Sequence, residues 1–161
     1  MNFESFEDIK VLMDNFDPAS LLPDLSTLPG LVATLTRFAV LAGPIVLLIM
    51  GILYFFLSPK EANYHFGYRC YFGMGSVEAW RFTQRFAGVF WAVLGLVLTV
   101  VMLLITGGYG SKDVSEIIHS GLSCLVWEII LAALSCLVIN VTAMILFDRK
   151  GLRRRDSWRK V

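Results

Sequence analysis

The side chain best suited to chemistry in this sequence is a glutamate surrounded by apolar residues. Glu128 is the only formal charge within the apolar run from Leu122 to Phe147. An ionised carboxylate deep in a membrane costs about 3 kcal/mol on insertion scales, so we expect it to be protonated, paired or in contact with water. Two roles fit: a protonated glutamate that hydrogen-bonds to Thr99 or a backbone carbonyl, or a site for an ion, a proton or a ligand. Asn140 is better suited to a hydrogen bond between helices than to a ligand contact.

A second group of polar and aromatic residues lies between residues 59 and 85. Ser76 followed by Glu78 is typical of a helix start, because a serine oxygen caps the first free backbone N–H groups. This helix would place Trp80 at the membrane interface, where the amphipathic indole ring is favoured. We therefore expect a structured loop followed by a helix.

The arginines of this loop have two interpretations. Asn63 and Arg69 could fix the loop against carbonyl groups left free at helix ends. Alternatively, Arg69, Arg81 and Arg85 could hold an anionic headgroup or an acidic partner protein. The structural role is favoured, since loops rich in glycine and arginine at membrane edges commonly serve architecture.

Three long apolar runs must position these groups. They extend from Phe38 to Leu57, from Phe86 to Gly110 and from Leu122 to Phe147. About 20 apolar residues in a helix cover the roughly 30 Å of hydrocarbon in a bilayer. With 57% hydrophobic residues, a soluble domain is a distant second interpretation. We expect an all-α integral membrane protein, with a three-helix bundle over residues 31–148.

The charges predict an orientation. Basic residues are frequent in the loop between the first two runs and in residues 149–161, whereas the second connection has only Lys112. The positive-inside rule then places that loop and the C-terminus in the cytoplasm, and the N-terminus outside. Arg153, Arg154 and Arg155 would bind anionic lipid, each adding on the order of 1 kcal/mol. The net charge of +1 gives no indication of nucleic-acid binding.

Residues 1–30 have a different character. Apolar residues from Phe3 to Phe16 recur every three or four positions among acidic residues, and Asp17-Pro18 follows them. This pattern predicts an amphipathic helix outside the cytoplasm. Surface helices on lipid usually carry basic residues, so docking on the protein itself or on a partner is favoured.

Small residues recur on one face of two predicted spans. Gly88, Ala92, Gly95 and Thr99 follow one another at helical spacing, and a comparable stripe includes Glu128. Helices associate in membranes through such faces, so we expect both to contact protein.

No catalytic or metal-binding set is visible. His65 and His119 fall on opposite sides of the predicted membrane, and Cys124 lies about 18 Å along one helix from Cys136. We expect neither a metal, a cofactor nor an enzyme.

The loop resembles the SdpI/YfhL family of bacterial membrane proteins, and the resemblance extends over roughly residues 36–147. The matching residues are Asn63, Gly67, Tyr68, Arg69, Ser76, Glu78 and Trp80. Two positions depart from the family pattern: Cys70 replaces a usual threonine, and Gln84 replaces an asparagine or histidine. The resemblance implies a protein of the bacterial cytoplasmic membrane that binds or senses a peptide or small ligand, in an immunity or signalling role.

Two other functions stay open. Several copies could associate through the glycine face and form a channel or carrier with Glu128 in its pathway. The chain could also be an accessory subunit of a larger membrane complex.

Overall fold

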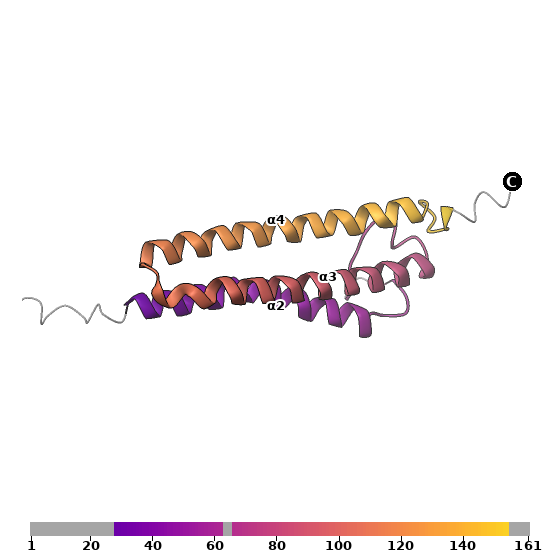
Figure 1. The fold of residues 1–161 in the computed structure, drawn as a ribbon. Coiled ribbons are helices and arrows are strands. Elements are labelled where there is room, and N and C mark those ends of the chain that lie inside the picture. Colours follow the sequence, from indigo (N-terminus) through magenta and orange to yellow (C-terminus); the bar gives the residue numbers. More distant parts are fainter. Residues whose placement is uncertain (1–27, 63–65, 155–161) are drawn as a thin grey trace, which may run out of the picture.

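The computed structural model describes residues 28–62 and 66–154 of the chain. The predicted N-terminal amphipathic helix therefore lies outside the described residues, as do Asn63 and Arg155. The described residues form three long helices and one short 3-10 helix (Figure 1). In order they are α2 (Leu28–Phe56), α3 (Val77–Gly107), η3 (Gly108–Ser111) and α4 (Val114–Leu146).

Each long helix is apolar and long enough to cross a membrane, which confirms the predicted all-α fold with three spans. Most large apolar side chains point outward, as lipid-facing residues do; Leu104 is 76% exposed and Ile129 is 69% exposed. The helices also extend beyond the apolar runs. For example, α2 begins at Leu28 rather than near Phe38. Hydropathy marks only the part of a helix that fits the hydrocarbon, whereas backbone hydrogen bonds continue into the polar layers.

The pair α2–α3 is held by glycines that bring the two backbones into contact. A Cβ atom on Gly88 would lie 2.7 Å from the backbone nitrogen of Phe55, and one on Gly95 would lie 2.5 Å from that of Leu48. From the other side, Gly51 lies against the backbone of Ala92. Close backbone approach is how helices gain van der Waals contact in lipid. The glycine face of α3 is thus used within the chain.

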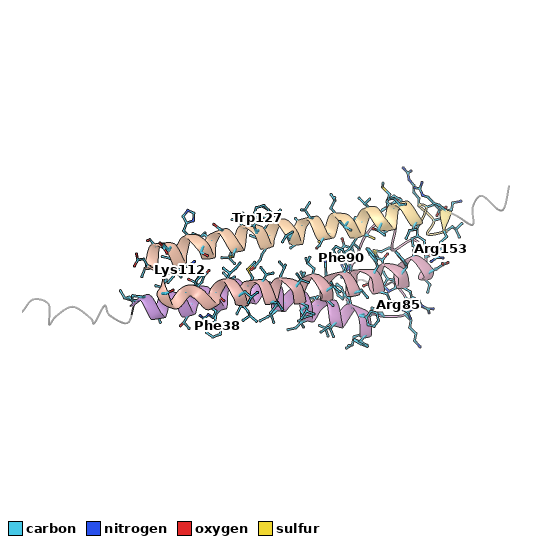
Figure 2. The ribbon with its side chains drawn as sticks, in the orientation of Figure 1. Phe38, Arg85, Phe90, Lys112, Trp127 and Arg153 are labelled. Carbon is cyan, nitrogen blue, oxygen red and sulfur yellow. The ribbon has the colours of Figure 1, made fainter. Side chains whose placement is uncertain are left out.

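Helix α4 joins this pair through side chains. Its Cys124 belongs to a buried cluster with Val40, Leu98 and Met102, and its Gly121 lies against Thr36 of α2. Figure 1 shows α4 running along the pair, with the α3–α4 connection at one end and the long α2–α3 connection at the other. We call the latter the loop end. Figure 2 shows Lys112 at the connection end and Arg85 and Arg153 at the loop end.

Candidate functional site

The α2–α3 loop is anchored by a glutamine that pairs with a backbone. The Tyr68 N–H donates to Gln84 Oε1 (2.7 Å), and Gln84 Nε2 donates back to the Tyr68 carbonyl (2.6 Å). Gln84 is fully buried in α3, and both bonds are part-buried. The oxygen and the nitrogen of the amide each satisfy one backbone group, and this fixes Tyr68 on α3.

Trp80 and Gly67 complete this anchor. The indole of Trp80 is fully buried and its Nε1–H donates to the Pro59 carbonyl (2.9 Å). Gly67 has φ +122°, and a Cβ there would lie 2.7 Å from the Trp80 ring. Both the backbone angle and the space therefore require glycine. The loop folds over the indole and covers it, while the interfacial depth expected for Trp80 stays a prediction.

Tyr68 links the loop to α4. Its hydroxyl donates to the Cys136 carbonyl (3.1 Å), and its ring packs edge-on against Trp91 with centroids 5.3 Å apart. Trp91 in turn donates from Nε1 to the Ser135 hydroxyl (2.9 Å). Burial raises the pKa of Tyr68 well above its usual value, so the hydroxyl keeps its proton and acts as a donor.

Cys70 forms a tight turn after this contact. The Gly73 N–H donates to its Sγ (3.2 Å), and the Met74 N–H donates to its carbonyl (3.1 Å). Burial raises the pKa of the Cys70 thiol, which lowers its thiolate fraction at neutral pH. The thiol therefore has the surroundings of a structural cysteine.

Ser76 caps α3 and also holds the C-terminal segment. Its Oγ accepts from the Ala79 N–H (3.1 Å), as the sequence predicts for a helix start, and donates to the Gly151 carbonyl (2.7 Å). Nearby, Glu78 pairs with Arg153 (3.2 Å) on the surface. Ser76 and Glu78 therefore connect the start of α3 with residues that follow α4.

Residues 147–154 form what we call the C-terminal hook, which sequence reasoning did not foresee. Phe147 is fully buried, and Asp148 Oδ1 accepts from the N–H groups of Lys150 and Leu152 (2.9 and 2.8 Å). Arg154 Nε donates to the Phe147 carbonyl (3.4 Å). Arg153 and Arg154, two of the three arginines expected to bind lipid, thus contact other residues of the chain. An aspartate two residues before Lys150-Gly151 is a turn signal, and it could have revealed the hook.

Arg69 and Asn140 line one shallow cavity of ≈ 400 Å³ between the loop and α4. Both residues are exposed. Asn140 also forms a side-chain hydrogen bond with Tyr68 of the loop, and its expected hydrogen bond to another helix stays a prediction.

Glu128 is well separated from the loop residues. It precedes Cys136 by about 12 Å along α4 at standard helix rise. The side chain is 8% exposed, and its Oε1 has no hydrogen-bond partner among the described residues. The Thr99 hydroxyl, considered above as a partner, instead donates to the Gly95 carbonyl of its own helix (2.7 Å).

Glycine and proline of α2 make room for this carboxyl group. A Cβ on Gly43 would lie 2.6 Å from Glu128 Oε2, so a larger residue at position 43 would displace the carboxyl group. Glu128 also lines an apolar cavity of ≈ 270 Å³ with Pro44, Leu47 and Leu98. Proline lacks an N–H group, so the Val40 carbonyl one turn earlier has no helical donor. The pair Gly43-Pro44 therefore faces the buried glutamate.

The structure brings the described loop-motif residues together and leaves the intramembrane glutamate apart. Gly67, Tyr68, Arg69, Ser76, Glu78 and Trp80 all lie at the loop end, while Gly88, Ala92 and Gly95 lie against or beside α2. Among the described residues, no group of three or more His, Cys, Asp or Glu side chains is placed to hold a metal ion.

Comparison with known proteins gives one match. The model of the SdpI/YfhL protein family matches residues 60–146, from the loop through α3 and α4. No curated protein and no solved structure matches the chain.

Proposed function

Because the chain belongs to the SdpI/YfhL protein family, we propose that it binds a peptide or small ligand in the membrane and relays this binding to the loop end, in immunity or signalling. The observation that supports the proposal most is the buried Glu128 carboxyl beside an apolar cavity, with an oxygen that lacks a partner among the described residues. Leaving a buried polar group unsatisfied costs about 1–3 kcal/mol. A ligand that donates a hydrogen bond would remove this cost.

The cavity suggests what part of a ligand enters. Its volume of ≈ 270 Å³ is below the roughly 300–1,000 Å³ typical of sites for whole small molecules. Its lining is apolar except for Glu128. A fitting group is therefore an aliphatic chain with one N–H or ammonium donor, such as a lysine side chain or the amino terminus of a peptide.

Helix α4 provides the route from this cavity to the loop. It carries both Glu128 and the Ser135–Cys136 pair, to which Trp91 and Tyr68 donate hydrogen bonds. The pair α2–α3 is locked by backbone contact at glycines, whereas α4 is held by side chains. A ligand that enters beside Glu128 would therefore shift α4 rather than separate α2 from α3, and this shift would change the Tyr68 contact.

The orientation of the protein in the membrane is inferred from the distribution of its basic residues. Under the positive-inside rule, the loop end and the C-terminal hook face the cytoplasm of a bacterial cell. A ligand from outside would then reach Glu128 from the opposite half of the bilayer.

An oligomeric channel or carrier is less well supported. Its expected interface was the glycine face of α3, and α2 of the same chain covers that face. Liposome flux that depends on Glu128 would nevertheless favour a carrier over a receptor. For an accessory subunit, the matching test is co-purification of a partner in fixed stoichiometry.

The proposal is tested in a strain that lacks the gene and carries either the wild-type or the Glu128→Gln protein. Growth is measured against a panel of cationic membrane-active peptides. We expect the wild-type protein to raise tolerance to at least one peptide and Glu128→Gln to lose that gain. Glu116→Gln, which changes an exposed carboxylate in the first turn of α4, is the matched control. Equal tolerance with and without the gene across the panel would contradict the proposal.

A further inference from the structure

Two arginines on the outer face of α3 separate two cavities at the loop end. Arg81 and Arg85, one helical turn apart, line both of them. The larger cavity, of ≈ 720 Å³, runs over Phe82 and Phe86, and the smaller one, of ≈ 410 Å³, includes Lys60. Figure 2 places Arg85 at this end of the bundle.

The charge around these cavities is not balanced. The smaller cavity is lined by Lys60, Arg81 and Arg85 and by no acidic residue. In the larger cavity the acidic residue is Glu78, and it pairs with Arg153 (3.2 Å). An anion would therefore meet an excess of positive charge on both sides of the arginine pair.

The two guanidinium groups are available for such an anion. Arg81 Nε donates to the Lys60 carbonyl (3.2 Å), which positions the group and leaves its terminal N–H donors. Arg85 is exposed, and within residues 28–62 and 66–154 it makes no hydrogen bond or ion pair. Arginine donors match phosphate oxygens in a two-point geometry, which makes arginine better suited than lysine to such a site.

The floor of the larger cavity is apolar and points into the membrane. The Phe82 and Phe86 rings stack with centroids 5.8 Å apart, and Phe86 stacks on Phe90 at 6.0 Å. Val89, one turn further along, is 49% exposed. A free phosphate would use the arginines but not these side chains. An amphiphile with an anionic head would use both.

We propose that this face of α3 binds an anionic phospholipid of the leaflet at the loop end. Its phosphate lies between Arg81 and Arg85, and an acyl chain lies along Phe82, Phe86 and Val89. The apolar run that spans the membrane begins at Phe86, so the arginines lie at the depth where headgroups occur. This site does not involve Glu128 and stands independently of the function proposed above.

Native mass spectrometry of the full-length protein in detergent tests the site. The protein is titrated with phosphatidylglycerol and, separately, with zwitterionic phosphatidylcholine of the same acyl chains. We expect the wild type to prefer phosphatidylglycerol and the Arg81→Gln/Arg85→Gln variant to bind it roughly tenfold or more weakly. Arg149→Gln/Lys150→Gln removes two exposed charges outside both cavities, and we expect it to keep the preference.

Two further controls are needed. One tests whether the acyl chains contribute to binding, and the other tests whether the variant is folded. Glycerol phosphate, which has the anion without the chains, is expected to compete weakly with the lipid. If it competes as well as the lipid, the acyl-chain site is wrong. If the double variant does not fold by circular dichroism, Arg85→Gln alone decides, because no described contact depends on that side chain. An unchanged lipid preference in a folded variant overturns the proposal.

Discussion

Gln84 and Glu128 are both buried, but they differ in whether their polar atoms have hydrogen-bond partners. At the loop end, the oxygen and the nitrogen of the Gln84 amide both form hydrogen bonds with the backbone of Tyr68. Within the membrane, Glu128 faces an apolar cavity and its Oε1 lacks a partner among the described residues. Fully paired groups support the fold, whereas an unpaired one lowers stability. The difference therefore separates the architectural region from the region proposed to bind a ligand.

The largest expected effect comes from breaking the loop anchor. Gln84→Ala leaves the N–H and carbonyl of Tyr68 without partners, and we expect a loss of about 3 kcal/mol in stability. Thermal unfolding in detergent measures it. Arg85→Ala, one position along on the exposed side, is expected to change stability by less than about 0.5 kcal/mol. Similar losses in both variants would show that the paired amide is not special.

The opposite sign is expected at Glu128. Replacing the carboxyl with an apolar side chain of similar size, as in Glu128→Leu, removes an unsatisfied group and is expected to stabilise the protein by about 1 kcal/mol. The same unfolding assay measures it, and peptide tolerance is expected to fall in parallel. A loss of stability as large as that of Gln84→Ala would mean that the carboxyl is paired and structural.

A smaller effect is expected where the loop meets α4. Tyr68→Phe removes the hydrogen bond to the Cys136 carbonyl and is expected to cost about 1 kcal/mol. Because the folded protein raises the pKa of Tyr68, the neutral hydroxyl stabilises the fold below the ordinary tyrosine pKa of about 10. This contribution is lost at higher pH. The unfolding temperature of the wild type should therefore fall more steeply above about pH 10 than that of Tyr68→Phe, and parallel curves would contradict the assignment.

The smallest effect concerns Cys70. Its thiol accepts from the Gly73 N–H and is partly buried, and its pKa is raised. We expect maleimide labelling in the folded protein to be slower than in the same protein unfolded by detergent and urea, and to accelerate as the pH rises. Mass spectrometry of the labelled peptide follows the rate. Rapid labelling at neutral pH would indicate that the loop opens readily.

The amount that sequence reasoning could predict differs between the two regions. The spans were predictable because the length of an apolar run can be compared directly with the thickness of the hydrocarbon core. Ser76 as a cap was predictable because a cap depends on residues a few positions away. The Gln84–Tyr68 pairing was not, since it joins residues 16 apart through a loop path that no local pattern specifies. The arginines near the C-terminus were interpreted as lipid contacts, and the turn that forms the C-terminal hook was therefore not predicted.

The surroundings of Glu128 could be predicted from the sequence only in part. A charge in an apolar run predicted a buried polar group, and the structure places one there. Which residue of α2 faces it depends on how the helices are aligned. The space left by Gly43 therefore became visible only when α2 and α4 were placed together.

The contact between Tyr68 and Cys136 also has a consequence for how the protein is made. Its two partners lie 68 positions apart, and the Ser76–Gly151 bond joins residues 75 apart. A ribosome synthesising this chain exposes the loop well before α4 exists, so the loop cannot reach its final form until the last span has entered the bilayer. Chains that stop early would present an unfinished loop, which gives cellular quality control a way to distinguish them from complete ones.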